Sequence, residues 1–113
     1  MIIDTDVLIW YLRGNHVAYK VIEDAANFSI SVITYMELVQ GMRNKQELNN
    51  LRKAIYSWNA KILYISEDIY VKAMFYVEQQ FLSSSLQLAD ALIGATAIAY
   101  GLPLLTGTTN ATE

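Results

Sequence analysis

The sequence predicts an α/β domain in which a parallel sheet of about four strands is flanked by helices. Four short apolar stretches have strand character, at residues 1–4, 28–32, 62–65 and 102–106. Two segments with helical spacing of apolar residues separate each strand from the next. Strands that alternate with helices form parallel sheets with helices on both faces. A chain of 113 residues is near the usual size of one domain, so we expect a single domain over residues 1–113.

Signals at the segment ends support this order. Arg13-Gly14 is typical of a helix end, Ser66 of an N-cap, and Gly101 of a helix stop. Thr34 and Glu37 have the spacing of a capping box, so we expect a helix to begin after Thr34. The six expected helices cover residues 7–12, 19–26, 35–42, 46–58, 67–81 and 86–100.

The composition is more apolar than that of an average soluble domain. Apolar residues make up 54% of the chain, which includes eight Tyr and two Trp, against roughly 45–50% in typical domains. The excess indicates that some apolar surface is covered by another chain. We expect self-association through helical surface around Tyr56, Trp58, Tyr70 and Phe75.

Charge and cysteine content exclude several classes of protein. The net charge is −3, so no global basic field holds a nucleic acid. Cysteine is absent, which excludes disulfides, thiolate metal sites and thiol nucleophiles.

The N-terminus lacks the pattern of a signal peptide. Residues 91–112 carry no charge, but glycines and Pro103 interrupt them, so no membrane span is expected. We expect a soluble, cytoplasmic protein.

Three isolated acids, Asp4, Glu37 and Asp90, stand in otherwise apolar segments. Burying a carboxylate is costly unless it is paired or bound to a cation. Asp4 and Thr106 lie at the carboxyl ends of two expected strands, which is where sites form in parallel sheets. Carboxylate oxygens suit Mg²⁺ or Mn²⁺. Such ions can activate water and stabilise the leaving oxygen in phosphodiester hydrolysis, which predicts a metal-dependent phosphodiesterase.

Each of these residues also has a purely structural interpretation. Asp6 is a candidate N-cap for a helix that begins at residue 7, and Glu37 a capping-box partner. Asp90 is a candidate first-turn acid that interacts favourably with the helix dipole. Thr106 either caps a turn or donates its hydroxyl to a metal-bound water.

Other chemistry is poorly supported. His16 is the only histidine and has no second histidine for a metal site, so we interpret it as a residue at a helix start. Ser83 to Ser85 have no visible histidine or lysine partner, which favours a loop over a nucleophile. The sequence contains no phosphate-binding glycine loop and no dinucleotide fingerprint.

Four motifs give the chain its resemblance to a known family. The first is residues 2–9, with the sequence Ile-Ile-Asp-Thr-Asp-Val-Leu-Ile. The other three are residues 31–38, 88–97 and 104–107. Taken in this order, they resemble the four motifs of PIN domains, and in pattern the nearest relatives are VapC-type toxins of toxin–antitoxin pairs. The resemblance covers the chain from end to end and implies a PIN-like fold.

The resemblance implies a Mg²⁺-dependent endoribonuclease, the toxin of a type II toxin–antitoxin system. Asp4, Glu37 and Asp90 match its three core acids, which hold Mg²⁺ or Mn²⁺. Asp6 falls where the family often has Asn and is expected to assist, and Thr106 matches a hydroxyl residue near the metal. The resemblance also implies an RNA substrate, a homodimer, and an antitoxin that inserts a segment into the acidic groove.

The chain departs from the family pattern at its end. Thr108 stands where relatives commonly have Asn or Asp, and relatives usually continue beyond the position of Glu113. The alternative is therefore a catalytically weak or inactive PIN-like module that only dimerises and binds an antitoxin. A haloacid-dehalogenase-type phosphatase, suggested by the Asp4-x-Asp6 pair, also needs a downstream lysine and a further acidic pair. Only seven residues follow Thr106, so we reject it.

Overall fold

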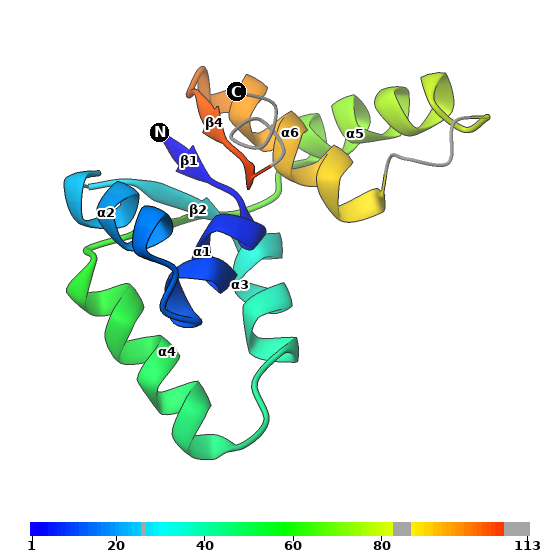
Figure 1. Cartoon of the computed structure of the whole chain (residues 1–113). Helices are drawn as coiled ribbons and strands as arrows, with labels where there is room; N and C mark the ends of the chain where they lie inside the picture. Colours follow the sequence, from blue (N-terminus) through cyan, green and yellow to red (C-terminus); the bar gives the residue numbers. More distant parts are fainter. Residues whose placement is uncertain (26, 83–86, 108–113) are drawn as a thin grey trace.

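The chain forms one parallel four-stranded sheet with the strand order β3-β2-β1-β4 (Figure 1). The computed structural model describes residues 1–25, 27–82 and 87–107. The predicted fold class and the predicted order of strands and helices are both confirmed. The strands are β1 (Ile2–Ile3), β2 (Ser29–Ser31), β3 (Lys61–Leu63) and β4 (Leu104–Leu105).

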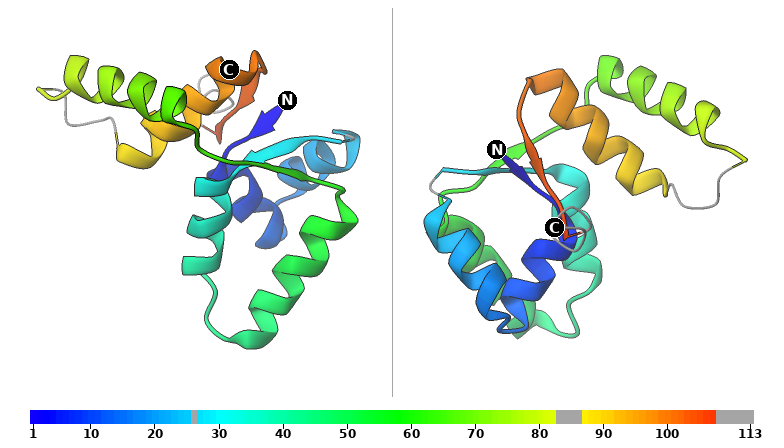
Figure 2. Two further views of the ribbon diagram at one scale, coloured as in Figure 1. Left: turned by 180° about the vertical axis from the view of Figure 1, so that it is seen from behind. Right: turned by 45° about the horizontal axis from the view of Figure 1, so that its top comes forward.

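Helices cover both faces of this sheet. Figures 1 and 2 show α5 and α6 on the side of the sheet away from α1, α2 and α4. The crossover between each pair of successive strands contains two helices, as the sequence predicts. Their bounds are α1 (Thr5–Leu12), α2 (His16–Asp24), α3 (Val32–Gln40), α4 (Lys45–Ser57), α5 (Glu67–Gln79) and α6 (Leu88–Tyr100).

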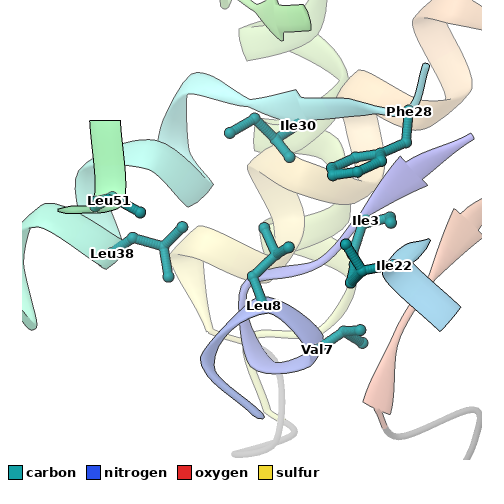
Figure 3. Close-up of a cluster of buried hydrophobic side chains, with 8 residues drawn as sticks. All are labelled: Ile3, Val7, Leu8, Ile22, Phe28, Ile30, Leu38 and Leu51. Carbon is teal, nitrogen blue, oxygen red and sulfur yellow. The ribbon is translucent and has the colours of Figure 1, made fainter. Parts of the chain in front are cut away.

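Side-chain alternation along β1 divides the core between the two faces. Successive residues of a strand point to opposite faces. Ile3 joins the cluster formed with α1, α2, α3 and α4, which Figure 3 shows around Leu8 and Phe28. Ile2 packs instead with Leu63 and with Ala97 of α6. The central strand is buried on both sides, which explains why its sequence is continuously apolar up to Asp4.

Three predicted helix starts are wrong, and α2 begins at His16 rather than at residue 19. Helix α1 begins at Thr5 rather than at residue 7, because Asp4 is the N-cap and its Oδ1 accepts from the Thr5 amide at 2.7 Å. Helix α3 begins at Val32, with the Ser31 hydroxyl accepting from the Ile33 amide at 3.1 Å. Thr34 therefore lies inside α3, and the predicted capping box between Thr34 and Glu37 does not form.

Other local predictions are confirmed or corrected individually. His16 is the first residue of α2, Ser66 is the N-cap of α5, and Gly101 ends α6 with φ of 64°. Trp58 was expected on an interaction surface, but its ring packs against Tyr11 and Phe28 beside the core. Ser83 to Ser85 lie outside the described residues. Every helix in the described parts of the chain is too short or too polar to cross a bilayer.

Candidate functional site

The carboxyl edge of the sheet brings the first and last motifs together. Strands β1 and β4 pair in parallel with Ile3 opposite Leu105, so Asp4 and Thr106 are the next residues in register. The Asp4 amide donates to the Leu105 carbonyl at 2.9 Å, which continues this pairing past the strand end. Helix α3 starts directly after β2, the other neighbour of β1. Its second turn carries Glu37.

Asp4 is in the most unfavourable environment for a charged carboxylate. Burial raises the pKa of Asp4 from 3.8 to about 6, and the hydrogen bond from the Thr5 amide only partly opposes this shift. The negative charges of Asp6, Asp90 and Glu37 contribute to the same rise. Three acids, from α1, α3 and α6, thus act electrostatically on Asp4 at the end of β1. Charges of one sign gathered at a half-buried point are typical of a cation site.

A short hydrogen-bonded chain holds Glu37. The Thr5 hydroxyl donates to Oε1 of Glu37 at 2.7 Å, and the hydroxyls of Thr5 and Thr34 are hydrogen-bonded at 3.1 Å. Thr34 is fully buried and Thr5 nearly so. Because an ionised carboxylate only accepts, the single proton of Thr5 is directed to Glu37. Thr5 and Thr34 hold Glu37 in place.

Sequence reasoning missed these two threonines as members of the site. Thr5 belongs to the first motif but has no predicted role, and Thr34 is predicted to be an N-cap. The available signal was their polarity within segments that are otherwise apolar and buried, since a buried hydroxyl needs a partner.

Asp90 occupies the first turn of α6, three residues after the N-cap Gln87. Its carboxylate accepts from the Gln87 amide at 3.4 Å, a long hydrogen bond, and its side chain is exposed. The first-turn position supports the dipole interpretation. The same carboxylate nevertheless acts on Asp4 across the site, so the structural and functional interpretations coexist.

Asp6, in the first turn of α1, forms a hydrogen bond with the segment that follows β4. It is not the N-cap of that helix, and its Oδ1 accepts from the Val7 amide at 2.8 Å and from the Gly107 amide at 3.2 Å. A Cβ at Gly107 would lie 2.5 Å from Oδ2 of Asp6 and 2.5 Å from Cη2 of Trp10. Glycine is thus required after Thr106 by close packing. Asp6 brings the last motif beside the first.

The donor set fits Mg²⁺ or Mn²⁺ in type. It consists of carboxylate and hydroxyl oxygens, the ligands that hard cations prefer. The half-buried carboxylate of Asp4, with three further acids acting on it, is the observation that calls for a cation. Among the described residues, however, no three acids are grouped closely enough to form a complete ligand cluster. Glu37 is directed toward Thr5, and Asp90 toward its own helix start.

Comparison with known proteins identifies the family. The family model described as PIN domain matches residues 1–110. The chain belongs to the PIN domain family. This confirms the resemblance that the four motifs indicate. PIN domains are generally nucleases that use a divalent metal. No match was found among curated proteins.

Three chains of solved structures share this fold over most of its length. A chain from a toxin-antitoxin complex of Klebsiella pneumoniae is 30% identical, with a TM-score of 0.78, and the match covers 91% of this chain and 82% of that one. A chain of VapBC-1 from nontypeable Haemophilus influenzae is 19% identical, with a TM-score of 0.77 and coverage of 96% and 87%. A chain of FitAcB from Neisseria gonorrhoeae is 24% identical, with a TM-score of 0.66 and coverage of 91% and 84%.

Proposed function

We propose that this PIN domain is a metal-dependent endoribonuclease and acts as the toxin of a type II toxin–antitoxin pair in the cytoplasm. The observation that carries the proposal is the position of Asp4. This half-buried carboxylate follows the central strand and lies within electrostatic reach of Asp6, Glu37 and Asp90. The 30% identical chain from a toxin–antitoxin complex supports the biological role.

Asp4, Glu37 and Asp90 are the proposed ligands of Mg²⁺ or Mn²⁺. When bound, the metal lowers the pKa of water and offsets the negative charge of the substrate phosphate. Asp6 and Thr106 support the site, because Asp6 fixes the segment that follows Thr106. Thr5 acts as a positioning residue that holds Glu37 in one orientation. The RNA strand lies along the carboxyl edge of the sheet, where these residues gather.

The proposed partners are an antitoxin and a second copy of this chain. Helices α5 and α6 project from the rest of the molecule (Figure 2). Large apolar side chains on this helix pair are exposed to solvent, a feature of interaction surfaces. Tyr70 and Phe75, two residues expected at the self-association surface, are on it. These exposed residues are Tyr70, Val71, Met74, Phe75, Val77, Leu88, Ile98 and Tyr100.

The function is tested by cleavage of a mixed RNA pool with Mg²⁺ or Mn²⁺. Wild type is expected to cut the RNA, and both EDTA and Asp4→Asn to abolish cutting. Asp68→Asn is the matched control, because Asp68 lies on α5, exposed and paired with Lys72. No cleavage by wild type under any metal would overturn the proposed activity. Equal cleavage by wild type and Asp4→Asn would overturn the proposed site.

The alternative function is an inactive module that only dimerises and binds an antitoxin. The observation that favours it is the spread of the acids, which form no compact three-carboxylate cluster among the described residues. This module would form a dimer and a complex with the protein encoded by the adjacent gene, yet cut no RNA. Light scattering and co-purification, run beside the cleavage assay, distinguish the two functions.

A further inference from the structure

A cavity of about 580 Å³ lies between α1, α3 and α4, and Glu37 belongs to its lining. This volume is within the range of roughly 300–1,000 Å³ that is usual for small-ligand sites. Glu37 also accepts a hydrogen bond from Thr5, the residue after Asp4, so the cavity adjoins the acidic site. Apolar side chains provide much of its lining: Ile9, Leu12, Leu38, Met42 and Leu51.

Two arginines and two glutamates line this cavity, and one of the glutamates, Glu47, is paired with Arg43. The chain has three arginines, and two of them, Arg13 and Arg43, line it. Arg13 makes no ion pair with any other residue in the described ranges. A guanidinium group binds phosphate through two parallel hydrogen bonds. Arg13 is therefore the cavity's group that is available to a phosphate of the strand, while Arg43 is held by Glu47.

Glu47 occupies Arg43 in the free protein. Its Oε2 accepts from Nη2 of Arg43 at 2.7 Å and from Nε at 3.0 Å, and its Oε1 accepts from the Arg43 amide at 2.7 Å. One carboxylate oxygen thus accepts from both guanidinium N–H groups, which a phosphate would otherwise bind. The ion pair is exposed, so an incoming phosphate can compete for it at small cost.

We propose that this cavity is a nucleotide subsite for the RNA strand next to the scissile bond, an inference that rests on the proposed ribonuclease function. The base lies on the apolar lining, Arg13 holds its phosphate, and Arg43 adds a second phosphate contact when Glu47 releases it. The continuity with Glu37 and the two arginines favour RNA over a protein segment. The cavity therefore selects how the strand enters the acidic site.

The test measures binding of a fluorescein-labelled single-stranded RNA octamer pool by anisotropy. The Asp4→Asn background, and separately wild type in EDTA, keep the strand uncut. Arg13→Gln is expected to weaken binding about tenfold and to reduce the slope of log affinity against log salt by about 0.7. The matched control is Arg52→Gln, which removes the third arginine, outside the cavity lining. It is expected to change affinity less than twofold.

A second variant predicts a gain, which misfolding cannot imitate. Glu47→Gln removes the negative charge that pairs with Arg43 and is expected to tighten RNA binding about threefold. This gain is expected to exceed that of Glu78→Gln on α5, which removes the same charge outside the cavity lining. Equal effects of Arg13→Gln and Arg52→Gln, or of Glu47→Gln and Glu78→Gln, would overturn the subsite.

The outcomes separate this proposal from the proposed function. If wild type cuts RNA but the cavity variants bind like their controls, only the subsite is wrong. If wild type neither cuts nor binds RNA, both proposals are wrong. If Arg13→Gln leaves RNA affinity unchanged but breaks the complex with the protein encoded by the adjacent gene, the cavity belongs to a protein partner and the RNA subsite is overturned.

Discussion

The hydroxyl of Thr5 donates a 2.7 Å hydrogen bond to Oε1 of Glu37, 32 residues away in sequence. Thr5 is also the residue whose amide binds the Asp4 carboxylate. One threonine therefore links two of the proposed metal ligands, one at the end of β1 and one in the second turn of α3. A part-buried hydrogen bond therefore ties the Glu37 side chain to the residue that follows Asp4.

Thr5→Val tests this link. Valine has nearly the same shape, so the packing is kept, but Glu37 and the buried Thr34 hydroxyl each lose a partner. We expect a loss of about 1–3 kcal/mol in the free energy of unfolding, measured by urea denaturation. Mg²⁺ affinity, measured by calorimetry, is expected to fall as well. Thr5→Ser, which keeps the hydroxyl, is the control. Equal behaviour of the two variants would show that the hydroxyl positions nothing.

Gly107→Ala tests the packing of the last motif. The added Cβ would meet both Asp6 and the Trp10 ring at 2.5 Å, so these side chains must shift. We expect destabilisation of about 1–3 kcal/mol. Gly94→Ala is the control, because nothing lies within 4 Å of a Cβ there and alanine favours the interior of α6. It is expected to stabilise by roughly 0.5–1 kcal/mol. The same thermal shift in both variants would contradict the close approach.

The pKa of Asp4 predicts a pH-dependent stability. Folding raises this pKa from 3.8 to about 6, so the folded protein binds the proton more tightly than the unfolded chain does. This contribution to stability is complete below pH 3.8 and is lost as the pH rises through 6. Asp4→Asn, which keeps an N-cap side chain, is therefore expected to gain stability over wild type between pH 4.5 and 7.5. A constant difference in urea midpoint across that range would refute the shift.

Protons and the proposed metal compete for the same carboxylate. Mg²⁺ affinity of wild type is therefore expected to weaken as the pH falls below about 6.

Thr108 and Asp6 test the charge of the proposed site. Thr108, which lies outside the described residues, stands where the family commonly has a polar or acidic ligand. Thr108→Asp is expected to tighten Mg²⁺ binding and raise the nuclease rate, because each carboxylate adds charge that holds a hard cation. Asp6→Asn is expected to loosen binding while it keeps the oxygen that accepts from Gly107. If Thr108→Asp changes nothing, the segment after Gly107 does not face the site.

The sequence predicts the fold well because its main signals are local. Continuous apolar strands, helical spacing and residues such as Ser66 and Gly101 each report on their immediate neighbours. The helix starts at Asp4 and Ser31 were misassigned because several nearby polar residues can cap, and only tertiary packing selects among them. Thr34 illustrates this, since burial against Thr5 determines its role.

Contacts between segments far apart in the sequence were harder to predict. Asp6 and Gly107 are 101 residues apart, and no sequence spacing reveals their hydrogen bond. Trp58 was expected on an outer surface because the helical period does not say which face meets the core. In the structure its ring packs against Tyr11 and Phe28. The approach of Asp90 to Asp4 was expected from their shared apolar surroundings, and their electrostatic interaction is consistent with it.

Calorimetric titration of Mg²⁺ into Asp90→Asn tests the central claim most directly. Asp90 lies in the first turn of α6 and not at the end of a strand. Because its side chain is exposed, we expect Asp90→Asn to fold. If Asp4, Glu37 and Asp90 share one metal, Asp90→Asn binds Mg²⁺ at least about tenfold more weakly than wild type. Asp68→Asn, which removes an exposed acid of α5, binds it as wild type does. Equal Mg²⁺ affinity of wild type and Asp90→Asn would contradict the shared site.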